Sequence, residues 1–146
     1  MSDSKDKTQR ILVIDDDDDF VRLLTRMLES AVRHYQVVSA YSGQEGLTMM
    51  QRRQPDLVLL DLVLPDVHGS KLVEHIRAVP DWKEVPIVII SGQDETDNQE
   101  PLEGCVILAK GKGLMPAEVV RLVQHVVDMS VTSLPSSAGP KGVPLR

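Results

Sequence analysis

The chain has 146 residues and a net charge of −6, which argues against binding to a nucleic-acid backbone as a main activity. Hydrophobic residues make up 42% of it and aromatic residues only 3%, so we expect one globular domain with an aliphatic core. No apolar run approaches the roughly 20 residues of a membrane span. The polar first seven residues do not form a secretory signal, and the single cysteine, Cys105, fits a reducing compartment; we therefore expect a cytoplasmic protein.

The first half of the chain predicts strands and helices in alternation. Residues 1–9 are polar, and we expect them to be disordered. The apolar run 11–14 predicts a buried strand, and the helical spacing of apolar residues over 20–31 predicts a helix. Residues 35–40 predict a second strand, and a second helix starts at Ser42 and ends near Gln54. The run 57–60 is apolar at every position, which is typical of a strand buried on both faces.

The second half continues the alternation with one weak segment. A third helix is expected from about Ser70 to just before Pro80, and residues 86–90 and 105–109 predict two more buried strands. Residues 93–103 between those strands are almost wholly polar and contain Pro101, so we expect a short or irregular fourth helix. A last helix begins at Pro116. Residues 131–146 are expected to form a flexible tail or linker, which bounds the domain at residues 10–130.

This alternation predicts a parallel sheet with helices on both faces, and ligands bind such sheets at the carboxyl ends of the strands. Polar residues stand at four of these ends, namely Asp15 with Asp16, Asp61, Ser91 and Lys110. Each pair of close carboxylates costs a few kcal/mol at an effective dielectric constant of about 20. A hard cation such as Mg²⁺ relieves that repulsion. With a lysine and a hydroxyl beside it, the cluster suits a phosphoryl group, which one carboxylate could receive as an acyl phosphate.

Four motifs carry a family resemblance, at residues 11–16, 56–69, 86–92 and 106–110. Together and in this order they resemble the receiver domain of bacterial two-component response regulators, over about residues 10–130. The resemblance implies an α/β, flavodoxin-like three-layer sandwich whose five-stranded parallel sheet has the order 2-1-3-4-5. Three positions differ from the usual family pattern: Gly111 replaces a proline after Lys110, Ile107 replaces an aromatic residue, and Gly92 replaces an alanine.

The same resemblance implies a role for each residue of the cluster. Asp61 is the phosphoacceptor, which takes a phosphoryl group from a histidine kinase or a phosphotransfer protein. Asp15 and Asp16 bind Mg²⁺ together with Asp61, and the backbone carbonyl of Val63 supplies a further ligand.

Lys110 and Ser91 complete the implied machinery. Lys110 pairs with a phosphoryl oxygen, and Ser91 hydrogen-bonds the phosphoryl group and carries the switch to a changed partner-binding surface. Such a protein is a signalling switch and not a turnover enzyme. It makes no direct contact with nucleic acid or a membrane, its downstream target is unknown, and homodimerisation is left open.

Two other functions are left open by the residues. The first is a phosphorylation-independent scaffold with the same fold. The second is a haloacid-dehalogenase-type phosphatase, in which Asp15 would be the nucleophile of a D-x-D motif; that reading gives Asp61 no role. We expect Asp66 to be a turn residue and His68 to be a surface residue in the loop after Asp61.

Overall fold

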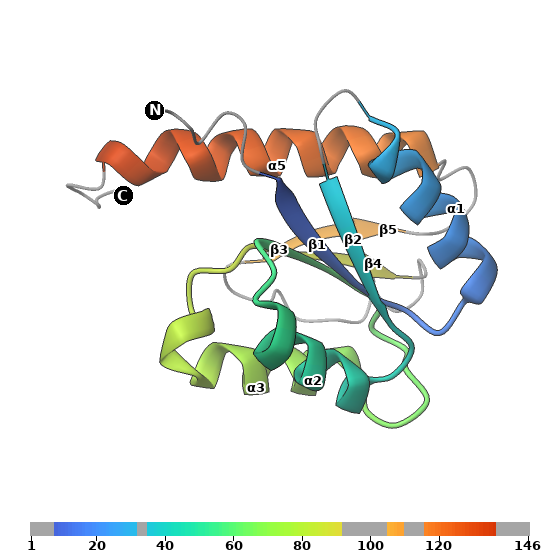
Figure 1. The fold of residues 1–146 in the computed structure, drawn as a ribbon. Helices are drawn as coiled ribbons and strands as arrows, with labels where there is room; N and C mark the ends of the chain where they lie inside the picture. Colours follow the sequence, from blue (N-terminus) through green and yellow to red (C-terminus); the bar gives the residue numbers. More distant parts are fainter. Residues whose placement is uncertain (1–7, 32–34, 92–104, 110–115, 137–146) are drawn as a thin grey trace.

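A five-stranded sheet lies between two layers of helices (Figure 1). The computed structural model describes residues 8–31, 35–91, 105–109 and 116–136. Every strand pairing is parallel and the order is β2-β1-β3-β4-β5, so the predicted flavodoxin-like sheet is confirmed. The strands are β1 (Gln9–Ile14), β2 (Tyr35–Ala40), β3 (Leu57–Leu60), β4 (Ile87–Ser91) and β5 (Cys105–Ala109).

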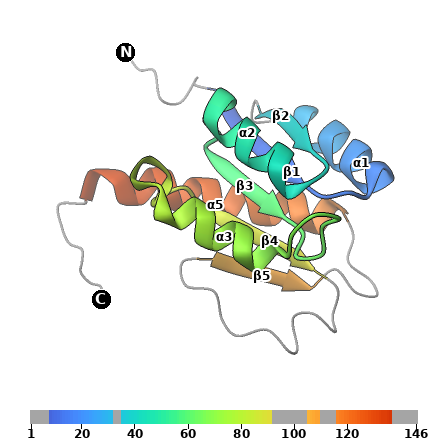
Figure 2. The same ribbon diagram turned by 90° about the horizontal axis from the view of Figure 1, so that it is seen from below.

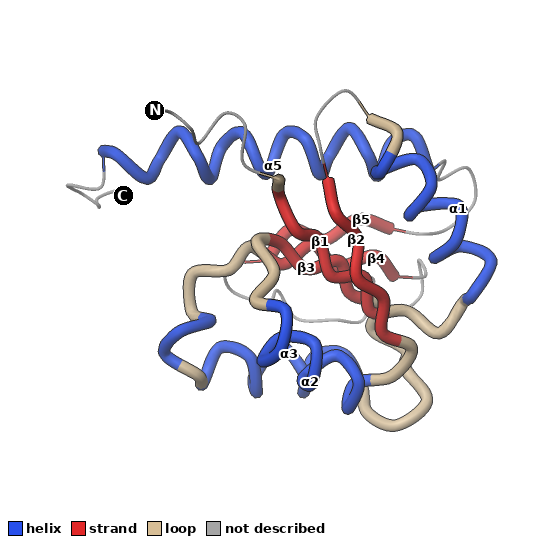
Figure 3. The backbone as a smooth tube through the Cα atoms, viewed as in Figure 1, coloured by secondary structure: helices blue, strands red, loops and turns tan. Residues whose placement is uncertain are grey.

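The helices divide between the two faces of the sheet (Figures 2 and 3). One face is covered by α1 (Asp18–Glu29) and α5 (Pro116–Ser136), and the other by α2 (Gly43–Arg53) and α3 (Gly69–Ala78). A 3₁₀ helix that the sequence analysis missed, η1 (Pro80–Trp82), joins α3 to β4. The predicted irregular fourth helix falls within residues 92–104, which lie outside the described part of the chain.

The central strands bury both of their faces, because successive side chains of a strand point to opposite sides of the sheet. Ile11 and Val13 of β1 join the core beneath α1 and α5. Leu12 and Ile14 join the second core, beneath α2 and α3. Every position of such a strand must therefore be apolar, which explains the uninterrupted apolar runs in the sequence.

The last three aspartates of the acidic run after β1 stabilise the start of α1. The Asp17 carboxylate caps the helix by accepting a hydrogen bond from the Phe20 backbone N–H at 3.2 Å. Asp18 and Asp19 form ion pairs with Arg22 at 3.0 and 2.9 Å. Carboxylates in a first helical turn also interact favourably with the helix dipole. Helix α1 consequently begins at Asp18, two residues before its first apolar side chain.

Two elements extend beyond the range of residues 10–130 predicted for the domain. Strand β1 begins at Gln9, inside the segment predicted to be disordered, because Gln9 pairs with Tyr35 of β2. Helix α5 continues to Ser136, into the segment 131–146 that was predicted to be a tail or linker. Residues 117–134 contain no glycine or proline. The helical hydrogen bonds can therefore continue past residue 130, where the helical spacing of apolar side chains ends. Residues 1–7 and 137–146 lie outside the described residues. Within those that are described, no helix is long and apolar enough to cross a membrane.

Candidate functional site: an acidic cluster at the strand ends

The register of the sheet brings three aspartates together. Ile14 at the end of β1 pairs with Leu60 at the end of β3, so the residues that follow emerge at the same level. The Asp61 N–H donates to the Ile14 carbonyl at 2.9 Å, which extends this pairing. Carboxylate oxygens of Asp15, Asp16 and Asp61 all lie within 4.8 Å of one another. The predicted meeting of these three residues is therefore observed.

Two carboxylates of the cluster are buried and the third is exposed to solvent. Asp15 is 2% exposed and Asp61 is 9% exposed, whereas Asp16 is on the surface. The Asp17 N–H donates to Asp15 Oδ1 at 2.9 Å, and the Val63 N–H donates to Asp61 Oδ1 at 3.3 Å. These backbone donors orient the carboxylates without cancelling their charge. Hard oxygen donors with an open side for water fit a hard divalent cation.

The loop from residue 61 to residue 69, here called the β3–α3 loop, folds back on its own start. The Gly69 N–H donates to the Leu62 carbonyl at 2.7 Å, and Val63 forms an isolated antiparallel bridge with His68. A Cβ atom at position 69 would lie 2.7 Å from Leu62 Cα and 2.8 Å from the Asp61 carbonyl oxygen. This close approach therefore requires glycine. It holds the Val63 backbone beside the acidic cluster.

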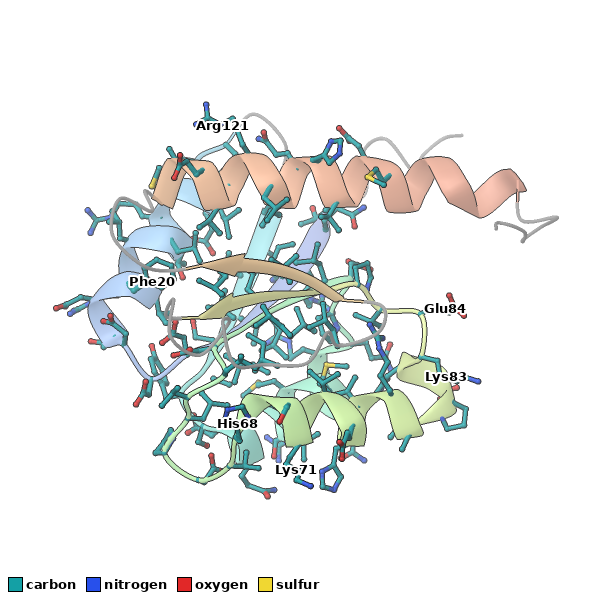
Figure 4. The ribbon with its side chains drawn as sticks, turned by 180° about the vertical axis from the view of Figure 1, so that it is seen from behind. Phe20, His68, Lys71, Lys83, Glu84 and Arg121 are labelled. Carbon is teal, nitrogen blue, oxygen red and sulfur yellow. The ribbon has the colours of Figure 1, made fainter. Side chains whose placement is uncertain are left out.

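Two residues of this loop have structural roles that the sequence analysis missed. His68 is the N-cap of α3, and its Nδ1 accepts a hydrogen bond from the Ser70 N–H at 3.2 Å. Asp66 accepts hydrogen bonds from the N–H groups of Gly43 and Gln44 at 2.8 and 2.9 Å. Asp66 has no local sequence signal for this contact, because its partners are 22 and 23 positions away. Figure 4 shows His68 at the same end of the molecule as Phe20, with Lys83 and Glu84 at the opposite end.

The remaining predicted site residues are only partly placed. Ser91 is the last residue of β4 and pairs with Ala109, the last residue of β5. The side chain of Ser91 and the whole of Lys110 lie outside the described residues, so their proximity to the cluster stays a prediction. Ile107 lies within β5, and Gly111 is not described.

Comparison with known proteins decides the family. The sequence model of one protein family, the response regulator receiver domain, matches residues 11–104. The chain belongs to this family. Among its relatives, PilH of Pseudomonas aeruginosa is 33% identical over 89 residues, which are 60% of this chain and 72% of PilH. The regulatory protein PhoP of Bacillus subtilis, named for alkaline phosphatase synthesis, is 32% identical over 88% of this chain and 52% of its own length. Response regulator PleD of Caulobacter vibrioides is 35% identical over 58% of this chain and 18% of its own length.

Solved receiver structures share the fold. A putative response regulator from Chloroflexus aurantiacus superimposes with a TM-score of 0.71 at 28% identity, covering 84% of this chain and 99% of its own. The chemotaxis response regulator CheY4 of Vibrio cholerae, at 23% identity, shows the fold alone; its TM-score is 0.72, over 82% of this chain and 99% of its own. The receiver-domain prediction is confirmed. These matches give no support to a haloacid-dehalogenase-type phosphatase or to a phosphorylation-independent scaffold.

Proposed function

We propose that this receiver domain is a phosphorylatable switch that accepts a phosphoryl group on Asp61 from a histidine kinase or a phosphotransfer protein. The phosphorylated form presents a changed surface to a partner protein. One observation carries the proposal: in a chain of this family, Asp61 lies at a strand end with its carboxylate within 4.8 Å of those of Asp15 and Asp16.

In this proposal the chain's own residues prepare the acceptor. A carboxylate oxygen of Asp61 forms a bond to phosphorus while the bond from phosphorus to the donor's leaving group breaks. The Val63 N–H orients the Asp61 carboxylate through its bond to Oδ1. Lys110 and Ser91 are assigned to the phosphoryl oxygens by the family resemblance.

The cation of the proposal is Mg²⁺, held by Asp15, Asp16, Asp61 and the backbone carbonyl of Val63. When bound, it supplies positive charge that stabilises the phosphoryl oxygens during transfer. The donor set supports this choice, because it consists of oxygens and leaves positions for water. The switch forms and loses its own phosphoryl group and turns over no other substrate. A cytoplasmic location and homodimerisation stay predictions.

The test is the intact mass of the protein after incubation with acetyl phosphate and Mg²⁺. We expect the wild type to gain the mass of one phosphoryl group, and Asp61→Asn to gain none. Omitting Mg²⁺ should also prevent the gain. Asp81→Asn is the matched control, because Asp81 is an exposed aspartate in η1, and the nearby residues Lys83 and Glu84 lie at the end of the molecule opposite His68 (Figure 4).

Other outcomes would contradict the proposal in recognisable ways. A mass gain that survives Asp61→Asn but not Asp15→Asn would indicate the phosphatase chemistry instead. A wild type that gains no mass from acetyl phosphate or from a phosphorylated kinase would indicate the scaffold.

A further inference from the structure

The first N–H groups of α2 depend on two different segments of the chain. The first N–H groups of any helix have no carbonyl partner within the helix. Ser42 caps α2 locally, since its hydroxyl accepts from the Glu45 N–H at 3.1 Å and its carbonyl accepts from the Gly46 N–H at 2.9 Å. The N–H groups of Gly43 and Gln44 do not donate to Ser42. Both donate to the Asp66 carboxylate, in the β3–α3 loop, at 2.8 and 2.9 Å.

The loop and the start of α2 are in direct contact at this point. A Cβ atom at position 43 would lie 2.3 Å from Val67 Cγ1 and 3.3 Å from Asp66 Oδ1. The hydrogen bond from Gly43, and then the one from Gln44, lower the pKa of the Asp66 carboxyl below its usual value. Asp66 is therefore ionised at neutral pH. Its charge also faces the positive end of the α2 dipole.

These bonds close a ring of backbone that runs through Asp15 and Asp61 of the acidic cluster. On one side, the Asp15 N–H donates to the Ala40 carbonyl at 3.0 Å, which fixes the turn leading into α2. On the other side, the Asp61 N–H donates to the Ile14 carbonyl at 2.9 Å, which fixes the start of the β3–α3 loop. Asp66 joins the far ends of both segments. The segments that follow β2 and β3 are thus linked outside the sheet, although β1 separates these two strands within it.

We propose that Asp66 is a positioning residue of the metal and phosphorylation site. It lies outside the cluster and acts by fixing the β3–α3 loop to α2, so that Val63 and Asp61 are already in place when the cation binds. The inference rests on the proposed function. A loop that is ordered in advance loses less conformational freedom on binding, so the cation binds more tightly.

The experiment is a calorimetric titration of the full chain with Mg²⁺. We expect Asp66→Ala to raise the Kd for Mg²⁺ on the order of tenfold, as the loss of a residue that orients metal ligands typically does. Asp66→Asn should give an intermediate Kd, because the amide nitrogen that replaces one carboxylate oxygen cannot accept a hydrogen bond, so one of the two N–H groups loses its acceptor. In ¹⁵N-labelled protein, the amide resonances of Gly43 and Gln44 should shift in both variants. Asp81→Ala removes the same charge from an exposed position in η1 and should bind Mg²⁺ like the wild type.

The alternative outcomes separate the positioning role from the proposed function. A wild-type Kd in both Asp66 variants would overturn the positioning role. Equal weakening by Asp66→Ala and Asp81→Ala would also overturn it, since net charge alone would then explain the effect. If circular dichroism shows that Asp66→Ala does not fold, the Kd of Asp66→Asn decides between the same outcomes. A wild type that binds no Mg²⁺ would overturn the proposed function itself, whereas wild-type binding that is insensitive to Asp66 would overturn this inference alone.

Discussion

At the scale of the residue, the aspartates of this chain differ in what surrounds them. Asp15 and Asp61 are buried in a cluster of like charges, whereas Asp66 is held by two backbone donors. The cluster follows from the sequence, because an aspartate directly after an apolar strand must emerge at the carboxyl edge of the sheet. The role of Asp66 does not follow from it, because that role depends on where α2 packs against a distant loop.

The lowered pKa of Asp66 predicts a pH dependence of stability. An unfolded aspartate has a pKa of about 3.9. The pKa of Asp66 in the folded protein lies lower, because of the hydrogen bonds from Gly43 and Gln44. Its stabilisation is therefore present above the unfolded pKa and is lost as the pH falls through the folded pKa. We expect wild type to exceed Asp66→Asn in free energy of unfolding at neutral pH, with the difference shrinking below about pH 4.

Urea denaturation of both proteins over a pH series measures this difference directly. Subtracting one curve from the other removes the titration of the remaining carboxylates, which the two proteins share. A difference that stays constant down to the most acidic samples would contradict the assignment.

At the scale of the element, the strands were the most predictable part of the chain and the short connections the least. Strands β1, β3 and β4 are buried on both faces, so their apolar runs could be recognised without any tertiary information. Helix η1 could not be predicted from apolar periodicity, because a side chain of the preceding helix, Arg77 of α3, binds the backbone of this segment. Arg77 Nη1 donates to the carbonyls of Trp82, Lys83 and Val85 at 3.1, 2.9 and 2.8 Å.

The packing of α2 against the β3–α3 loop predicts the effect of Gly43→Ala. Alanine is the better helix former, but its Cβ would lie 2.3 Å from Val67 Cγ1. Overpacking of this kind costs about 1–3 kcal/mol of unfolding free energy. We expect Val67→Ala in the same chain to restore most of the loss, because it removes the clashing methyl group.

A double-mutant cycle on unfolding free energies isolates that coupling. Val67→Ala alone serves as the control for the lost methyl groups. Purely additive effects of the two substitutions would show that the contact between α2 and the loop is not tight in solution.

At the scale of the whole molecule, the repulsion within the cluster opposes folding until a cation is present. We expect Mg²⁺ to stabilise the wild type against urea by about 2.7 kcal/mol at a concentration 100 times its Kd. Asp61→Asn should respond less, because it has lost one of the three clustered carboxylates. Sodium chloride at equal ionic strength controls for general screening. Equal stabilisation by both salts would contradict a specific site.

The chain contains a single tryptophan, and its position in η1 has a practical consequence. Trp82 packs against the core beneath α2 and α3. Its neighbours Lys83 and Glu84 lie at the end of the molecule opposite His68, a residue of the loop that starts at Asp61 (Figure 4). We therefore expect the fluorescence of Trp82 to change when the core unfolds and to stay unchanged when a cation binds to the folded protein. One optical signal can follow unfolding with and without Mg²⁺ on the same native baseline.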